Sequence, residues 1–126
     1  MHTLFDCLLV FLGGGMGALS RYGVQNLGIF DEDKYYYTVA INISGCLTIG
    51  ILWAFFQHYN VPKALYLCAL TGFLGGYTTY SAFTLDAMQL VQDGYWWKAA
   101  FYIGITVVGG LGGCALGLFL TERILK

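Results

Sequence analysis

Four apolar segments account for almost the whole chain, and short polar stretches separate them. The segments cover residues 4–22, 37–56, 64–85 and 99–120. Roughly 20 apolar residues in an α-helix cross the hydrocarbon core of a bilayer. Hydrophobic residues make up 58% of the 126 residues and charged residues only 10%, unlike the balance of a soluble domain. We therefore expect an all-α integral membrane protein with four transmembrane helices, and a single membrane domain over residues 1–126.

The third segment contains a stretch that does not suit a continuous membrane helix. Residues 72–81 combine three glycines with three hydroxyl residues: Gly72, Gly75, Gly76, Thr78, Thr79 and Ser81. Both residue types favour non-helical backbone. In hydrocarbon such backbone is tolerated only where it is buried in protein or lines a polar cavity. The sequence therefore predicts a functional break of the third helix, in the middle of the membrane and within residues 72–81.

The basic residues near the segment ends are balanced between the two sides of the membrane. With the N-terminus inside, three lie on each side: Lys63, Arg123 and Lys126 inside, and Arg21, Lys34 and Lys98 outside. An excess of Lys and Arg on one side normally fixes the orientation of a membrane protein. A chain without this excess can insert both ways and pair with an inverted copy of itself.

One face of the second segment carries polar side chains. Thr38, Asn42 and Cys46 are four residues apart in an otherwise apolar stretch. An amide in the middle of a span costs free energy unless it is paired. Asn42 is therefore either a hydrogen-bonding contact between helices, worth about 0.6 to 2 kcal/mol, or a donor facing a polar path.

Other candidate side chains also have two interpretations. Arg21 ends the first segment, where it can extend to the interface or raise the anion concentration at a pore mouth. Tyr80 and Phe83 share a helix face after the break, and their positive ring edges can pack together or solvate a small anion. In the fourth segment, Tyr102 and Thr106 begin a stripe that is a candidate polar lining.

Small residues recur at four-residue spacing in two segments. Gly13 and Gly17 lie in the first segment, and Gly109, Gly113 and Gly117 lie in the fourth. Glycines at this spacing let helix backbones approach closely, so we expect packing rather than ligand binding.

The cysteines lack the C-x-x-C spacing of zinc and redox sites. All four fall in or near apolar segments: Cys7, Cys46, Cys68 and Cys114. We expect small buried hydrophobic residues rather than metal ligands or disulfides.

Three motifs resemble those of the Fluc (CrcB) fluoride channel family, and the resemblance spans all four segments. The motifs are Gly13-Gly14-x-x-Gly17-Ala18-x-x-Arg21-Tyr22, Thr38-x-x-x-Asn42-x-x-Gly45 and Gly72-Phe73-x-Gly75-Gly76-x-Thr78-Thr79-Tyr80-Ser81-x-Phe83. The third is the most specific. The fourth segment matches mainly through its length, its glycines and Tyr102.

The resemblance implies a fluoride-selective channel that exports fluoride from the cytoplasm and confers fluoride resistance. It implies a multi-pass protein of the inner (plasma) membrane: an antiparallel, dual-topology homodimer with two pores, surrounded by lipid and without a nucleic-acid partner. A structural sodium ion at the dimer centre would bind backbone carbonyls of Gly75 and Thr78. Seven residues would line the fluoride path: Arg21, Asn42, Tyr80, Ser81, Phe83, Tyr102 and Thr106.

The chain departs from the usual family pattern at five positions. Tyr80 stands where Phe is usual, and Ala82 where Thr is usual. Gly110 and Cys114 replace positions that often carry Ser or Thr, and Asp86 takes the place of a Glu.

Two other classes of membrane protein compete with a fluoride channel. A small proton-coupled multidrug transporter needs a carboxylate inside the membrane, and we expect no Asp or Glu deep in a span, since Asp6 lies near an end. A non-conducting membrane assembly subunit would explain the glycine stripes but not the polar break. An enzyme is not expected, because no nucleophile, base and oxyanion site converge.

Overall fold

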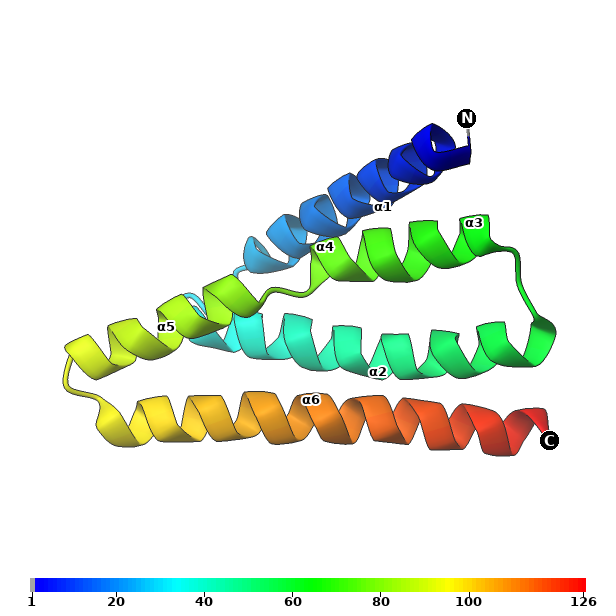
Figure 1. The fold of residues 1–126 in the computed structure, drawn as a ribbon. Helices are drawn as coiled ribbons and strands as arrows, with labels where there is room; N and C mark the ends of the chain where they lie inside the picture. Colours follow the sequence, from blue (N-terminus) through cyan, green and yellow to red (C-terminus); the bar gives the residue numbers. More distant parts are fainter. Residues whose placement is uncertain (1) are drawn as a thin grey trace.

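The chain folds into four helical crossings that run side by side (Figure 1). This computed structural model describes residues 2–126, and these residues contain no β-strand. Three crossings are long helices: α1 (His2–Gln25), α2 (Tyr35–Tyr59) and α6 (Trp96–Leu125). The remaining crossing consists of α3 (Lys63–Tyr66), the π-helix η1 (Leu67–Leu74), α4 (Gly75–Tyr77) and α5 (Tyr80–Gln92). Both termini lie at the same end (Figure 1), as four antiparallel crossings require.

The expected all-α fold with four crossings is confirmed, and α1, α2 and α6 are each long and apolar enough to span a membrane. The helices extend beyond the apolar segments because helical backbone continues into the polar interface. The largest difference is at α5, which continues to Gln92, whereas the third apolar segment ends at residue 85. Asp86 therefore lies inside a helix rather than after it.

The helix interruption is narrower than the stretch of residues 72–81. Gly72 lies in η1, and Gly75 and Gly76 lie in α4, all with helical backbone. Only Thr78 (φ −77°, ψ 155°) and Thr79 (φ −147°, ψ 118°) are extended. Gly72 and Gly76 serve close packing on α1, since a Cβ at Gly76 would overlap the carbonyl oxygen of Gly14.

The first crossing packs on η1 and α4 through backbone contact. A Cβ at Gly13 would overlap the carbonyl oxygen of Cys68, and one at Gly17 would overlap that of Phe73. From the other side, a Cβ at Gly72 would lie 3.0 Å from the carbonyl oxygen of Val10. The expectation that the α1 glycines serve packing is confirmed.

The second and fourth crossings form the most extensive helix pair, and they run in the same direction (Figure 1). A Cβ at Gly109 would come within 3.1 Å of Ile43 Cγ1, and one at Gly113 would lie 3.4 Å from the Ile43 carbonyl oxygen. A Cβ at Gly117 would overlap the carbonyl oxygen of Leu47. The fourth-segment glycines therefore also serve close packing.

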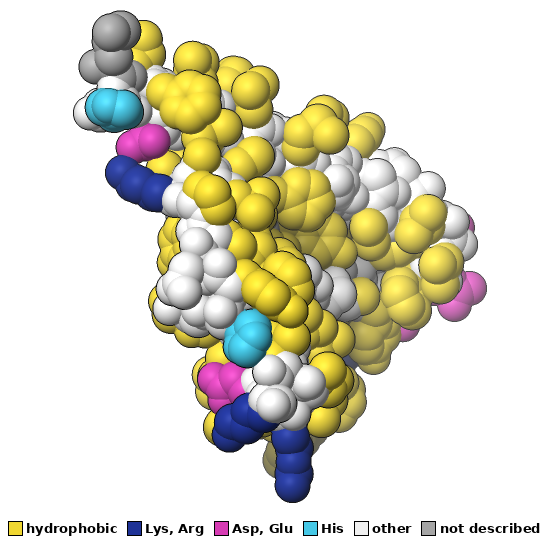
Figure 2. Space-filling model, turned by 90° about the vertical axis from the view of Figure 1, so that its right-hand side faces the viewer, with side chains coloured by type: hydrophobic (Ala, Val, Ile, Leu, Met, Phe, Trp, Pro, Cys, Tyr) yellow, Lys and Arg dark blue, Asp and Glu magenta, His cyan; other side chains and the backbone are white. Residues whose placement is uncertain are grey.

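Charged side chains gather at the two ends of the molecule. Lys63 pairs with Asp6 at 2.8 Å at the end that carries the termini, and Lys98 pairs with Asp33 at 2.6 Å at the other. Figure 2 views the first end, where a few charged groups interrupt a largely hydrophobic surface. Large apolar side chains are exposed along α1 and α6, among them Phe11 at 75%. Such a surface is expected of a protein surrounded by lipid and other apolar partners.

The contact between α1 and η1 can be tested with one alanine on each side of the helix. Gly17→Ala is expected to lower the thermal unfolding midpoint of the detergent-solubilised protein, because overpacking typically costs about 1–3 kcal/mol. Gly15→Ala is the control, since it makes the same gain in helix propensity and its Cβ meets nothing within 4 Å. Equal midpoints for the two variants would contradict the backbone contact.

Candidate functional site

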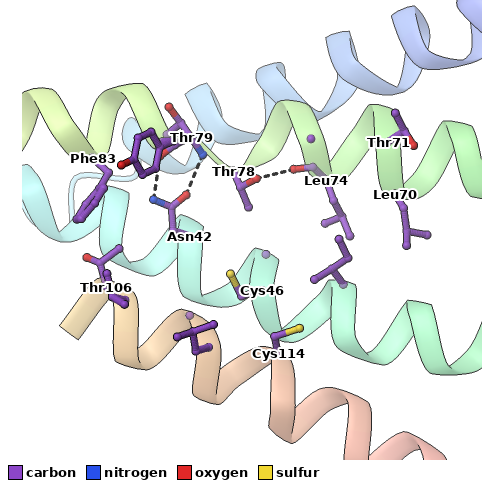
Figure 3. Close-up of a pocket in the computed structure, with 17 residues that line it drawn as sticks. Asn42, Cys46, Leu70, Thr71, Leu74, Thr78, Thr79, Phe83, Thr106 and Cys114 are labelled. Atoms are coloured by element: carbon purple, nitrogen blue, oxygen red, sulfur yellow. Dashed lines mark hydrogen bonds between the residues drawn. The ribbon is translucent and has the colours of Figure 1, made fainter. Parts of the chain in front are cut away.

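An open cavity of about 650 Å³ lies beside the helix interruption, between the third crossing on one side and α2 and α6 on the other (Figure 3). Seventeen residues line it: Asn42, Gly45, Cys46, Ile49, Leu70, Thr71, Leu74, Gly75, Thr78, Thr79, Tyr80, Phe83, Thr106, Val107, Gly110, Leu111 and Cys114. We call this cavity the groove. It is mainly apolar, and its polar groups cluster at the interruption.

The Asn42 side chain holds the extended backbone of Thr79 with two hydrogen bonds. Asn42 Nδ2 donates to the Thr79 carbonyl oxygen at 3.0 Å, and the Thr79 N–H donates to Asn42 Oδ1 at 2.8 Å. The amide of α2 thus replaces two bonds that a continuous helix would make, and Figure 3 shows both. Of the two interpretations of Asn42, the helix contact is present. Its amide has one further N–H, and the residue also lines the groove.

The same hydrogen bonds leave two backbone carbonyls without their usual helical partners. In a continuous α-helix, the Gly75 carbonyl would accept from the N–H of residue 79 and the Thr78 carbonyl from that of residue 82. The Thr79 N–H donates to Asn42 instead, and the Ala82 N–H donates to the Thr79 hydroxyl at 3.2 Å. Gly75 and Thr78 both line the groove. Two residues of the groove wall have thus lost the N–H donors that a continuous helix would give their carbonyls.

Three aromatic rings extend the site along α5 and α6. The Tyr80 and Phe83 rings lie 5.8 Å apart and tilted by 55°. Phe83 is 9% exposed and stacks on Tyr102 at 5.5 Å, whereas Tyr80 is 78% exposed at the open side of the groove. Phe83 is therefore fixed by the core, and Tyr80 is free to contact whatever covers the groove.

A hydrogen-bonded triad lies behind Phe83. Thr38 Oγ1 and Tyr102 Oη both donate to Asp86 Oδ2, at 2.8 and 2.9 Å. Asp86 lies inside α5 and not after the third crossing, because α5 is longer than the apolar segment. We did not predict this triad. Its only sequence signals are that Thr38 lies one turn before Asn42, and Asp86 about one turn after Phe83.

The groove brings together six of the nine residues selected from the sequence: Asn42, Gly75, Thr78, Tyr80, Phe83 and Thr106. The other three lie outside its lining. Arg21 is near the end of α1, Ser81 is exposed with its hydroxyl 3.3 Å from that of Thr79, and Tyr102 is buried behind Phe83. Thr106 Oγ1 donates to the Tyr102 carbonyl oxygen at 2.8 Å, so the hydroxyl must rotate before it can donate into the groove.

The cysteines are less buried than expected. Cys7 is exposed, and the other three are half-buried. Cys46 and Cys114 both line the groove, so they are not core residues. All four cysteines are free thiols.

Comparison with known proteins shows the family to which this chain is similar. Residues 8–118 match the family described as CrcB-like protein, Camphor Resistance (CrcB). The chain is 40% identical to the fluoride-specific ion channel FluC of Azotobacter vinelandii over 118 residues, which cover 91% of this chain and 95% of that protein. It is 32% identical to the FluC protein of Desulfotalea psychrophila over 129 residues, covering 99% and 98% of the two chains.

A further relative, the FluC protein of Beijerinckia indica, is 40% identical over 126 residues, or 94% of this chain and 98% of its own. The fold and the groove define a small multi-pass helical membrane protein with a polar interruption in one crossing. The chain belongs to the CrcB family. The family resemblance found in the sequence motifs is thereby confirmed.

The hydrogen bonds between Asn42 and Thr79 can be tested by truncation. Asn42→Ala leaves two backbone groups unpaired, and each such group typically costs about 1–3 kcal/mol, so we expect a clearly lower thermal unfolding midpoint. Ser44→Ala is the matched control on the same helix. Its hydroxyl also bonds across to the third crossing, at 3.0 Å from Tyr77 Oη, but it is exposed, so its loss should be small. We call the two hydrogen bonds between Asn42 and Thr79 the Asn42–Thr79 clamp. An Asn42→Ala midpoint no lower than that of Ser44→Ala would show that the clamp is dispensable for stability.

Proposed function

We propose that this protein is a fluoride-selective channel that lets fluoride leave the cytoplasm across the plasma (inner) membrane and so confers fluoride resistance. The single observation that supports this most is the groove at the Asn42–Thr79 clamp, in a chain whose relatives are named fluoride-specific ion channels. Membership of this family also assigns the chain to ion channels and not to enzymes, and it disfavours the multidrug transporter and the assembly subunit.

The groove forms only one wall of an ion path, so a second surface must close its open side. It is open on one side, where Tyr80 and Leu111 are largely exposed. Polar backbone at the interruption cannot face lipid without a large cost in free energy. We therefore propose that a second copy covers it, in an antiparallel homodimer with two equivalent pores. The balanced Lys and Arg count supports the inverted orientation.

The freed carbonyls of Gly75 and Thr78 fit a structural sodium ion between the two copies. Hard cations prefer oxygen ligands, and these two oxygens have lost their helical N–H partners to Asn42 and to the Thr79 hydroxyl. Two copies would present four such oxygens. The ion would neutralise these dipoles and hold the interruptions of both chains together.

Selection of fluoride over chloride must rest on size and donor geometry, because both ions carry one negative charge. The remaining N–H of Asn42 and the ring edges of Tyr80 and Phe83 lie at one part of the groove. Ser81, Tyr102 and Thr106 carry hydroxyls near the same rings, and Arg21 would attract anions at a mouth of the pore. A narrow path with such donors replaces the water of a small anion better than that of a larger one.

The aromatic contribution is tested by Phe83→Ile. This variant keeps apolar bulk but loses the ring edge, so fluoride efflux from liposomes should fall strongly while the dimer is retained. Leu85→Ile, at an exposed position on the same helix, should conduct as the wild type does. Unchanged efflux in Phe83→Ile would place the ion path elsewhere.

The amide contribution is tested by comparing Asn42→Asp with Asn42→Ala in the same efflux assay, with chloride as competitor. Both variants remove the donor to the Thr79 carbonyl, but Asn42→Asp should conduct less than Asn42→Ala, because only Asp places a carboxylate in the path that repels the anion. Efflux at the wild-type rate in Asn42→Asp would exclude Asn42 from the path.

The dual topology is tested by adding two lysines after Lys126. The added charge should drive insertion to one orientation and reduce efflux, unless a copy with the opposite bias is co-expressed. Labelling of a cysteine in the tail from both sides of the membrane reports orientation. A wild-type tail that is labelled from one side only would rule out dual topology.

A further inference from the structure

Two thiols lie together on the wall of the groove. Cys46 comes from α2 and Cys114 from α6, and both line the groove (Figure 3). Both are half-buried and free. They therefore differ from Cys7 and Cys68, which lie outside the groove lining, and no role has been assigned to them so far.

The register of the α2 and α6 pair places the two thiols next to each other. A Cβ at Gly50 would overlap the carbonyl oxygen of Cys114 and lie 2.9 Å from the Leu118 nitrogen, so Gly50 packs between these two residues. The helices run in the same direction, and Cys46 lies one turn before Gly50. Cys46 accordingly packs between Gly110 and Cys114.

Direct contact supports this register. Cys46 Sγ lies 3.4 Å from the position that a Cβ would take at Gly110, which is four residues before Cys114 on the same face of α6. Gly110 has no side chain to separate the two thiols. Both side chains also border open space in the groove, so their χ1 angles are free to change.

We propose that Cys46 and Cys114 form a two-thiolate site for a soft monovalent metal ion such as copper(I) or silver(I). Soft cations prefer thiolate ligands, and a site with two sulfurs suits ions that accept two-coordinate geometry. Binding replaces the proton of each thiol by one shared metal ion, so two protons are released for each metal ion bound. The resulting group carries one net negative charge at the groove wall.

This site gives the channel a means of inhibition, and that consequence rests on the proposed function. A metal ion beside Gly110 narrows the groove at this residue. The net negative charge of the ion with its two thiolates repels a passing anion. Metal binding itself requires only the α2 and α6 pair. The two consequences can therefore be measured separately.

The binding experiment uses full-length Cys7→Ser/Cys68→Ser protein in detergent, titrated with silver nitrate in chloride-free buffer with excess glutathione. We expect one silver ion per chain, with two sulfur neighbours in X-ray absorption. Two thiols held by one fold compete with a monothiol through their high effective concentration. Adding Cys46→Ser or Cys114→Ser should therefore transfer the silver to glutathione.

The transport experiment adds silver nitrate to liposomes of the same Cys7→Ser/Cys68→Ser protein and measures fluoride efflux. Silver should block efflux, and the further change Cys46→Ser should abolish the block. Silver that stays on glutathione in the binding experiment would overturn the metal site, whatever the efflux. Stoichiometric binding without a block would uphold the site and count against the groove as the ion path.

Discussion

The fold depends on how the backbone of Thr78 and Thr79 is satisfied inside a membrane protein. Two extended residues in a crossing expose N–H and C=O groups that hydrocarbon cannot solvate. The Asn42 amide pairs with both groups of Thr79, and the Thr79 hydroxyl caps the N-terminus of α5. The interruption is therefore a defined structure and not a flexible joint, and the same bonds release the carbonyls of Gly75 and Thr78.

Glycine packing decides where this interruption lies relative to the other crossings. The part of the third crossing before the interruption, η1 and α4, packs on α1 without intervening side chains. Residues such as Gly17 and Gly76 leave room for this backbone contact. After the interruption, α5 packs on α6, where Phe83 and Tyr102 stack. The two halves of the crossing thus belong to different helix pairs. The groove lies between the third crossing and the α2 and α6 pair, next to the hydrogen bonds of Asn42 with Thr79.

Polar groups on both sides of Phe83 give the site its chemical character. On the groove side lie Asn42 and the freed carbonyls, and behind the ring Asp86 accepts hydrogen bonds from Thr38 and Tyr102. Phe83 is held between them with little exposure. Such an arrangement suits a path in which a small anion exchanges water for fixed donors and ring edges, with the carboxylate kept away by its own partners.

The all-helical fold, the packing role of the glycines and the family could be predicted from the sequence, because apolar length, four-residue spacing and contiguous motifs are local properties. The glycines and hydroxyl residues also predicted a break, but only within the wider stretch of residues 72–81. Other features could not be predicted, because they depend on partners far apart in the sequence. Asn42 limits the break to two residues, and Thr38 and Tyr102 hydrogen-bond to Asp86 inside a helix. Cys46 and Cys114 likewise meet only through the register of α2 and α6.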